Sequence, residues 1–327
     1  MRYVSLFTGC GLLDLGLERA GWVPVMFCER DQHCQRVLAR HWPGVPVVGD
    51  VREVAADTEH AGSSRAGIGP QPVGALDGSL DAGAAQAAGN PTVVDLVVGG
   101  FPCQPVSYAG KRQAQSDDRW LWPEMARVVR ALRSRLVLVK NVPGLATAGL
   151  GEVIGDLAAA GYVGEWFRVR ASDVGAPHRR ERLFIVAVAA DSANERRDGH
   201  VPAFAARVAG QPRHSDRPAS ADADDGRCEQ HDEGERGVPV ARTDGAQPVA
   251  WGAYEPAIRR WEQVMGAAPA PTDDRGRLAP EFVEWMMGAP AGWTDGVSRT
   301  QRLKMLGNGV QVQVGELLGH ALAELTR

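Results

Sequence analysis

Short apolar segments alternate along this chain with segments of helical periodicity, and this alternation limits the fold more than any other feature. The segment 93–98 is apolar apart from Asp95, which indicates a strand buried on both faces of a sheet. Strands and helices in alternation predict a doubly wound α/β sheet. We predict strands over residues 3–7, 25–28, 45–51, 93–98, 136–139, 162–170 and 183–187, and helices over 12–20, 35–41, 120–133 and 153–160.

The first predicted strand ends in a glycine turn that precedes a helix. Thr8-Gly9-Cys10-Gly11 follows strand 3–7, and apolar residues recur from Leu12 onward. This arrangement is typical of nucleotide sites, because backbone amides at the helix N-terminus face the ligand. The second strand ends at Glu29, where an acid suits a ribose diol, and Asp50 lies at the tip of the third. We therefore predict a nucleotide-like cofactor at this edge of the sheet.

A second turn is suited to reactive chemistry. Gly99-Gly100-Phe101-Pro102-Cys103-Gln104-Pro105 follows strand 93–98, and its glycines and prolines predict a tight, exposed turn. A thiol in such a turn, at the end of a buried strand, is placed to attack a substrate in a cleft. A lone cysteine is more often a buried structural residue, so Cys103 needs the flanking sequence to identify its chemistry.

Composition excludes several classes of protein. The chain has 327 residues and its first residues lead directly into strand 3–7. Because it lacks any run of about 18 apolar residues, we expect no membrane span. Because these first residues form no charged-then-apolar leader, we expect an intracellular, cytoplasmic protein. Its five cysteines form no CxxC pair, which favours free thiols over disulfides or a metal. The net charge of −4 does not indicate a nucleic-acid binder, and the arginine clusters at 127–135 and 179–182 are more typical of a solvated surface.

Two stretches interrupt the alternating pattern. Residues 55–91 are rich in Ala, Gly, Ser and Pro and have no apolar period, which predicts a flexible surface insertion. Residues 191–250 are polar and rich in Gly, Pro and Asp, which predicts a loop-rich segment. Helical periodicity returns over 251–265 and 280–288, and a last helix runs to Leu325.

Four motifs in this order resemble the DNA cytosine-C5 methyltransferases. They are Leu6-Phe7-Thr8-Gly9-Cys10-Gly11, Gly-Phe-Pro-Cys-Gln-Pro at 100–105, Arg179-Arg180-Glu181-Arg182 and Gly307-Asn308-Gly309-Val310. The resemblance implies a Rossmann-like mixed sheet of the S-adenosylmethionine-dependent methyltransferase type. It implies a catalytic, cofactor-binding domain at 1–190 plus 299–327, with the insertion at 55–91, and a smaller target-recognition region at 191–298. It also implies double-stranded DNA as substrate, a monomer and a bacterial or phage origin.

The same resemblance assigns roles to individual side chains. Cys103 would supply the thiolate that adds to C6 of a flipped cytosine, while Arg180 and Arg182 would hold the base O2 and the thiolate side. No metal is expected. S-adenosylmethionine would lie among residues of the strand ends and turns, namely Phe7, Gly9, Gly11, Leu12, Glu29, Arg30, Asp50, Val51, Pro102, Asn308 and Val310. A generic small-molecule methyltransferase would share the cofactor turn but has no need of the Phe-Pro-Cys-Gln-Pro string.

One position departs from the family. Lys140 stands where the family has a glutamate that contacts both N3 and the N4 amino group of cytosine. An ammonium only donates hydrogen bonds, so a lysine that faces the N4 amino group leaves that group unpaired.

Three interpretations of Lys140 are open. The chain is a weakened or non-catalytic relative that still binds cofactor and DNA. Alternatively, the lysine donates to N3 from another angle, or to O4 of a flipped uracil or thymine. In the third, the lysine binds an anionic group on the cofactor, as in carboxy-S-adenosylmethionine, and the product is a carboxymethylated base.

Overall fold

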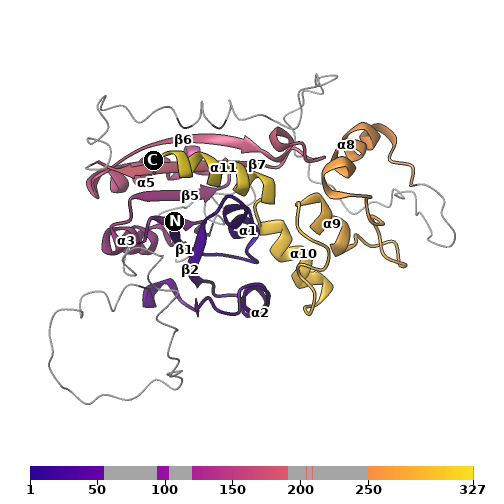
Figure 1. Ribbon diagram of the computed structural model, residues 1–327, viewed down its shortest axis with the longest axis horizontal. Coiled ribbons are helices and arrows are strands. Elements are labelled where there is room, and N and C mark those ends of the chain that lie inside the picture. The colour runs from indigo at the N-terminus through magenta and orange to yellow at the C-terminus, as the bar shows by residue number, and fades with distance from the viewer. Residues whose placement is uncertain (55–93, 103–119, 191–203, 205–207, 209–248, 327) are drawn as a thin grey trace, which may run out of the picture.

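The computed structural model describes residues 1–54, 94–102, 120–190, 204, 208 and 249–326. In this part of the chain a seven-stranded sheet has the order β3-β2-β1-β4-β5-β7-β6 (Figure 1). The strands from β3 to β5 are parallel, and β7 pairs antiparallel with both β5 and β6. The predicted doubly wound, mixed α/β sheet is confirmed.

The elements follow the predicted alternation closely. The strands are β1 (Arg2–Leu6), β2 (Val23–Cys28), β3 (Val47–Val48), β4 (Leu96–Gly99), β5 (Leu136–Asn141), β6 (Tyr162–Arg170) and β7 (Glu181–Ala189). The α-helices are α1 (Leu12–Arg19), α2 (Gln32–His41), α3 (Trp122–Leu132), α4 (Leu145–Ala148), α5 (Leu150–Ala159), α8 (Glu255–Met265), α9 (Pro280–Met286), α10 (Arg299–Asn308) and α11 (Val312–Glu324). Short 3₁₀ helices are η1 (Val51–Glu53), η4 (Ala171–Val174) and η5 (Gly252–Tyr254).

The third strand is much shorter than the predicted segment 45–51. Only Val47–Val48 pair with β2, and the chain then turns into η1. Asp50 causes the turn, because its Oδ1 accepts a hydrogen bond of 3.0 Å from the backbone N of Arg52 and caps the 3₁₀ helix. The acid at the tip therefore ends the strand before the apolar run is finished.

Side chains of the central strands alternate between two hydrophobic clusters. Val137 and Val139 of β5 belong to the cluster covered by α3 and α5. Leu136 and Leu138 of the same strand belong to the cluster covered by α1 and α11. Because helices cover both faces of the sheet, the sequence of a central strand is continuously apolar.

The C-terminal helix α11 packs directly on α1. A Cβ atom at Gly16 would lie 2.4 Å from the carbonyl O of Val312, and a Cβ atom at Gly315 would lie 2.8 Å from that of Leu13. The Trp22 indole Nε1 donates to Gly319 O at 2.9 Å. Glycines on both helices thus permit a backbone-to-backbone approach that joins the two ends of the chain.

The predicted region 191–298 contributes to more than one cluster. Trp261 and Trp285 pack with other residues of α8 and α9 in a separate small core. Phe204 and Val208, from the segment predicted to be loop-rich, have helical backbone and are buried in the α1–α11 cluster, where Phe204 contacts Phe167. The remainder of 191–248 and the predicted insertion at 55–91 lie outside the described residues.

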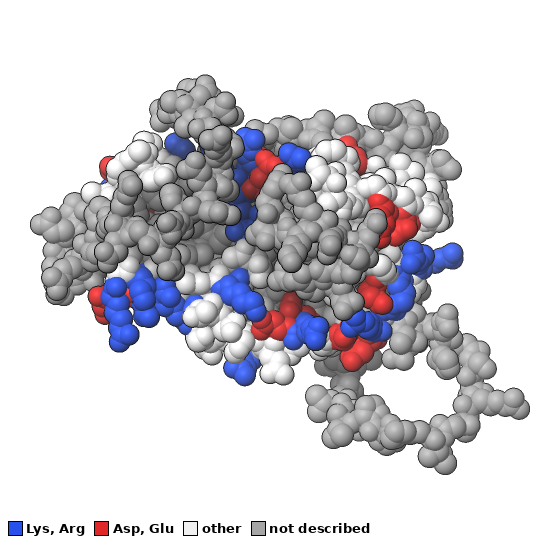
Figure 2. All heavy atoms as spheres, turned by 180° about the vertical axis from the view of Figure 1, so that it is seen from behind, with Lys and Arg blue, Asp and Glu red and all other residues white. Residues whose placement is uncertain are grey.

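The surface of the described residues carries both signs of charge. Figure 2 shows Lys and Arg side chains interspersed with Asp and Glu on the rear face. Arg127, from the first arginine cluster, pairs with Glu124 and donates to the carbonyl oxygens of Val51 and Val54, so it joins α3 to η1. In the described part of the chain, no helix is long and apolar enough to cross a membrane.

Two helical glycines give a matched test of the α1–α11 contact. Gly16→Ala should lower the free energy of unfolding by about 1–3 kcal/mol, because the added methyl group overlaps the backbone of α11. Gly155→Ala in α5, where a Cβ atom meets nothing within 4 Å, should raise it by up to about 1 kcal/mol. Urea denaturation of both variants measures the difference, and equal effects would contradict the close contact.

Candidate active site

A cavity of about 650 Å³ lies at the carboxyl ends of the parallel strands. It is bounded by the turn after β1, the ends of β2, β4 and β5, and the C-terminal end of α10. β1 lies between β2 and β4, so the connections from these strands diverge at this point. Ligands of α/β sheets bind at such a switch point. All of the residues predicted to contact a cofactor line this cavity except Gly11.

The turn after β1 has a left-handed backbone at three positions. Phe7, Gly9 and Gly11 have φ values of 55°, 65° and 77°. A non-glycine residue in this region is uncommon and marks a constrained loop. Gly11 is not on the cavity wall, and a Cβ atom there would lie 2.5 Å from the Trp42 ring at the end of α2. Gly9 stays on the cavity wall, where its backbone N donates to Glu29.

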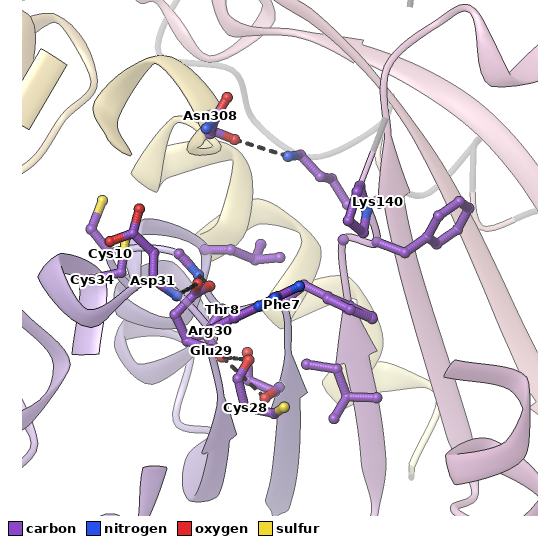
Figure 3. Close-up of a pocket in the computed structure, with 18 of the residues that line it drawn as sticks. Phe7, Thr8, Cys10, Cys28, Glu29, Arg30, Asp31, Cys34, Lys140 and Asn308 are labelled. Atoms are coloured by element: carbon purple, nitrogen blue, oxygen red, sulfur yellow. Dashed lines mark hydrogen bonds between the residues drawn. The ribbon is translucent and has the colours of Figure 1, made fainter. Parts of the chain in front are cut away.

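Glu29 follows β2 and is held in place by backbone amides. Its Oε2 accepts from Gly9 N and its Oε1 from Asp31 N, each at 2.7 Å. Burial raises the pKa of Glu29 above its ordinary value, while these two bonds act in the opposite direction. Each carboxylate oxygen accepts more than one hydrogen bond, so Glu29 keeps acceptor capacity toward a ligand. Figure 3 shows Glu29 on the same side of the cavity as Asp31 and Cys28.

Lys140 and Asn308 lie on another side of the cavity. Lys140 is half-buried near the end of β5, and its Nζ donates to Asn308 O at 3.0 Å, as Figure 3 shows. Arg180 donates through Nη2 to the carbonyl oxygens of Gly307 and, at 3.2 Å, of Gly309. Cations thus bond to consecutive carbonyl groups at the C-terminal end of α10, where a helix leaves carbonyls without partners. The structure therefore brings together Lys140, Arg180 and Asn308, which come from separate segments of the sequence.

The other two predicted catalytic residues are Arg182 and Cys103. Arg182 is half-buried in β7 and is not on the cavity wall; its Nη1 donates to Glu181 O at 2.8 Å. Cys103 lies outside the described residues, so its predicted role stays a prediction. The chain is anchored up to that point, because the buried Phe101 packs against Trp120 and Trp122.

Asp14 is a cavity residue that the sequence did not single out. It lies in the first turn of α1, only 1% of it is exposed, and it lines the cavity. Its Oδ1 has no hydrogen-bond partner among the described residues. Burial raises the pKa of this carboxyl group to about 7, and a hydrogen bond from Ser5 acts in the opposite direction. The signal that could have revealed it is Leu17, which lies three positions later on the same face of the helix and is fully buried.

Three thiols also line the cavity. Cys10, Cys28 and Cys34 are free and buried. Burial raises the pKa of Cys10 and of Cys28 to about 12, and that of Cys34 also rises. These thiols stay protonated at neutral pH, so they are poor nucleophiles compared with an exposed thiol of ordinary pKa.

The pKa of Asp14 predicts a pH-dependent stability. Because this pKa is raised from 3.8 to about 7 in the folded chain, the contribution of Asp14 to stability is present at low pH and is lost as the pH rises from about 4 through 7. Asp14→Asn removes that titration. We expect the free energy of unfolding of the variant, relative to wild type, to be higher at pH 8 than at pH 5. Urea denaturation at the two pH values tests this, and an unchanged difference would contradict the raised pKa.

Comparison with known proteins places this site in context. The Type II methyltransferase M.AquIA of Picosynechococcus is 30% identical over 57% of this chain and 71% of its own length. M2.BsuMI of Bacillus subtilis is 24% identical over 99% of this chain and 76% of its own. M.PspPI of Psychrobacter is 34% identical, but the match spans 58% of this chain and only 39% of that relative.

Solved structures and a family model agree with these relatives. A DNA modification methyltransferase encoded in an Escherichia coli prophage has a TM-score of 0.57 at 20% identity, over 100% of this chain and 99% of its own. DNMT2 of Spodoptera frugiperda has a TM-score of 0.55 at 13% identity. At these identities the likeness supports the fold alone. The model for C-5 cytosine-specific DNA methylases matches residues 1–65 and 80–235. The chain therefore belongs to the C-5 cytosine-specific DNA methylase family and is a DNA methyltransferase.

Proposed function

We propose that this chain modifies cytosine at C5 in double-stranded DNA, with S-adenosylmethionine as cofactor and Cys103 as nucleophile. One observation carries the proposal: the cavity at the strand ends is lined both by the glycine turn after β1 and by Pro102, which immediately precedes Cys103 in the chain. A cofactor in the cavity and a base near Cys103 would therefore be neighbours. The Rossmann-like fold and the family membership support the same assignment.

The cavity residues fit S-adenosylmethionine. Glu29 is a half-buried acid after β2 with remaining acceptor capacity, which suits a ribose diol. Phe7 and Val51 supply apolar surface beside Asp50, which suits an adenine ring. Asn308 lies on another side, beside Lys140, where the amino-acid end would extend. When bound, the cofactor supplies an electrophilic methyl group.

The chain's own chemistry centres on the thiol of Cys103. Its thiolate forms a bond to C6 of a cytosine flipped out of the duplex, and the electrons of the C5–C6 double bond make C5 nucleophilic. After C5 has been substituted, its proton is lost to a base and the bond between sulfur and C6 breaks, which restores the double bond and the thiolate. Arg180 and Arg182 would stabilise the charge that develops on the base.

Replacing Cys103 tests this chemistry directly. Cys103→Ala should abolish the covalent complex with DNA that contains 5-fluorocytosine, since only a working nucleophile is trapped, and should leave cofactor affinity within a few-fold of wild type. Cys228→Ala, a thiol outside the four motifs, is the matched control and should still form the complex. Gel electrophoresis under denaturing conditions detects the adduct. Undiminished product from Cys103→Ala would exclude the proposal, and no adduct from wild type would favour a non-catalytic DNA-binding relative.

The direction of the Lys140 side chain favours a second candidate function. Its Nζ bonds to Asn308, a residue that we assign to the cofactor, instead of pointing away from the cavity. A cation at this position would suit an anionic group on the cofactor sulfonium, as in carboxy-S-adenosylmethionine. The product would then be 5-carboxymethylcytosine. A charge-assisted hydrogen bond to a carboxylate is worth about 1.5–3 kcal/mol, which is a preference of about tenfold or more.

Charge reversal at Lys140 separates the two candidates. If Lys140 selects an anionic cofactor, Lys140→Glu should remove carboxymethyl transfer and raise methyl transfer, because a second negative charge repels the carboxylate. If Lys140 only weakens a methyltransferase, wild type should show methyl transfer alone and Lys140→Glu should increase it.

A second cavity lysine provides the control for this experiment. Lys304 pairs with Asp31 at 3.1 Å, on the Glu29 side of the cavity. Lys304→Glu should therefore affect both cofactors alike. The readout is the mass of the modified nucleoside after each protein is assayed with each cofactor on one DNA. The same preference and product from wild type and Lys140→Glu would show that Lys140 does not select the cofactor.

A further inference from the structure

Among the described residues that line the cavity, Asp14 has a role that the proposed function leaves unassigned. The catalytic scheme uses neither this carboxyl group nor the segment of α1 that carries it. Asp14 is almost completely buried, and its Oδ1 has no hydrogen-bond partner in the described part of the chain. A buried carboxyl oxygen without a partner costs folding free energy. Such a group suggests that a ligand completes its hydrogen bonding.

The positions of the charged residues around the cavity indicate which part of a ligand would meet Asp14. Glu29 and Asp50 follow β2 and β3, on one side of β1, and suit the adenosine end. Lys140 lies on the other side of β1 in the sheet, near the end of β5. Asp14 lies in the first turn of the helix that follows β1, the strand that lies between β2 and β5 in the sheet, and it shares the cavity wall with Ser5 and Val310. A cofactor that extends from Glu29 toward Lys140 therefore passes Asp14 with its amino-acid portion.

We infer that Asp14 binds the α-ammonium group of the cofactor's amino-acid end. This inference rests on the proposed function, because it takes S-adenosylmethionine as the ligand. An ammonium has three donors and no acceptor, so it needs acceptors in a site from which water is excluded. A carboxylate that is buried and already bonded to Ser5 offers one in a fixed position. The charge-assisted bond would satisfy the oxygen that lacks a partner.

The titratable neighbours of Asp14 are compatible with this role. Tyr3 of β1 donates from its hydroxyl group to the backbone O of Asp14 at 3.4 Å, and the same hydroxyl group also acts on the Asp14 carboxyl group and lowers its pKa. Cys10 and Glu18 are the other ionisable groups that interact with it electrostatically. β4 carries no titratable side chain between its ends. The packed helix α11 carries Glu316, which pairs with Arg19 at 3.9 Å, together with His320 and Glu324.

The test compares two ligands that differ only at the amino group. The probes are S-adenosylhomocysteine and its deaminated analogue, titrated calorimetrically into the full chain at pH 8. Wild type should bind the deaminated analogue at least about tenfold more weakly, because Asp14 then stays unpaired. Asp14→Asn, with its folding verified by urea denaturation, should reduce this discrimination to less than about threefold. Asp31→Asn removes a cavity carboxylate on the Glu29 side and should keep the discrimination of wild type.

A measurement on wild type alone tests the inference even if Asp14→Asn does not fold. At pH 7, S-adenosylhomocysteine should release protons as Asp14 becomes ionised, whereas the deaminated analogue should not; titrations in buffers of different ionisation enthalpy measure this release. If neither ligand binds wild type, the proposed cofactor is wrong. If both bind, and Asp14→Asn keeps the full discrimination or binding releases no protons, a buried water alone completes Asp14 and the inference is overturned.

Discussion

The pairing of β1 with β2 on one side and with β4 on the other is the constraint on which the candidate site depends. It places the turns after all three strands at one edge of the sheet and lets them diverge there. The pairing is held from outside by α11, which packs on α1 at Gly16 and so ties the end of the chain to its beginning. Asn308 and Val310 reach the cavity because α11 is fixed in this position.

The bonds from Lys140 and Arg180 explain how a cation is accommodated beside the cofactor cavity. The carbonyl groups of Gly307 and Asn308 belong to the last turn of α10, which has negative partial charge. An ionised glutamate at position 140 could not donate to Asn308 O, so this contact depends on the ammonium group of the lysine. This contact links β5 to α10 and orients Lys140 along the cavity wall, which is why charge reversal there is informative about the cofactor.

Most of the sheet and cavity could be predicted from the sequence, because parallel strands that are buried on both faces read as apolar runs that end in Gly or an acid. The predicted length of the third strand was wrong, since the capping bond from Asp50 acts locally and an apolar period cannot reveal it. Gly11 was assigned to the cofactor from its place in a glycine turn, but whether such a glycine faces a ligand or a neighbouring helix depends on tertiary packing, here on Trp42. Asp14 was missed because a lone acidic residue in a helical pattern is expected to face solvent, and only tertiary packing buries it here.

The half-buried Glu29 and the buried Asp14 show two ways in which a chain can hold a carboxyl group beside one cavity. Both oxygens of Glu29 accept backbone hydrogen bonds, so its position is fixed before any ligand arrives and its cost of burial is partly offset. Asp14 keeps one oxygen without a partner among the described residues, so its burial is offset less and its pKa rises further. The first arrangement provides a rigid acceptor, which suits the neutral hydroxyl groups of a ribose. The arrangement at Asp14 gains a charge-assisted hydrogen bond only when a positively charged group enters the cavity. The affinity of this end of the cavity would therefore depend on the charge of the ligand more than on its shape.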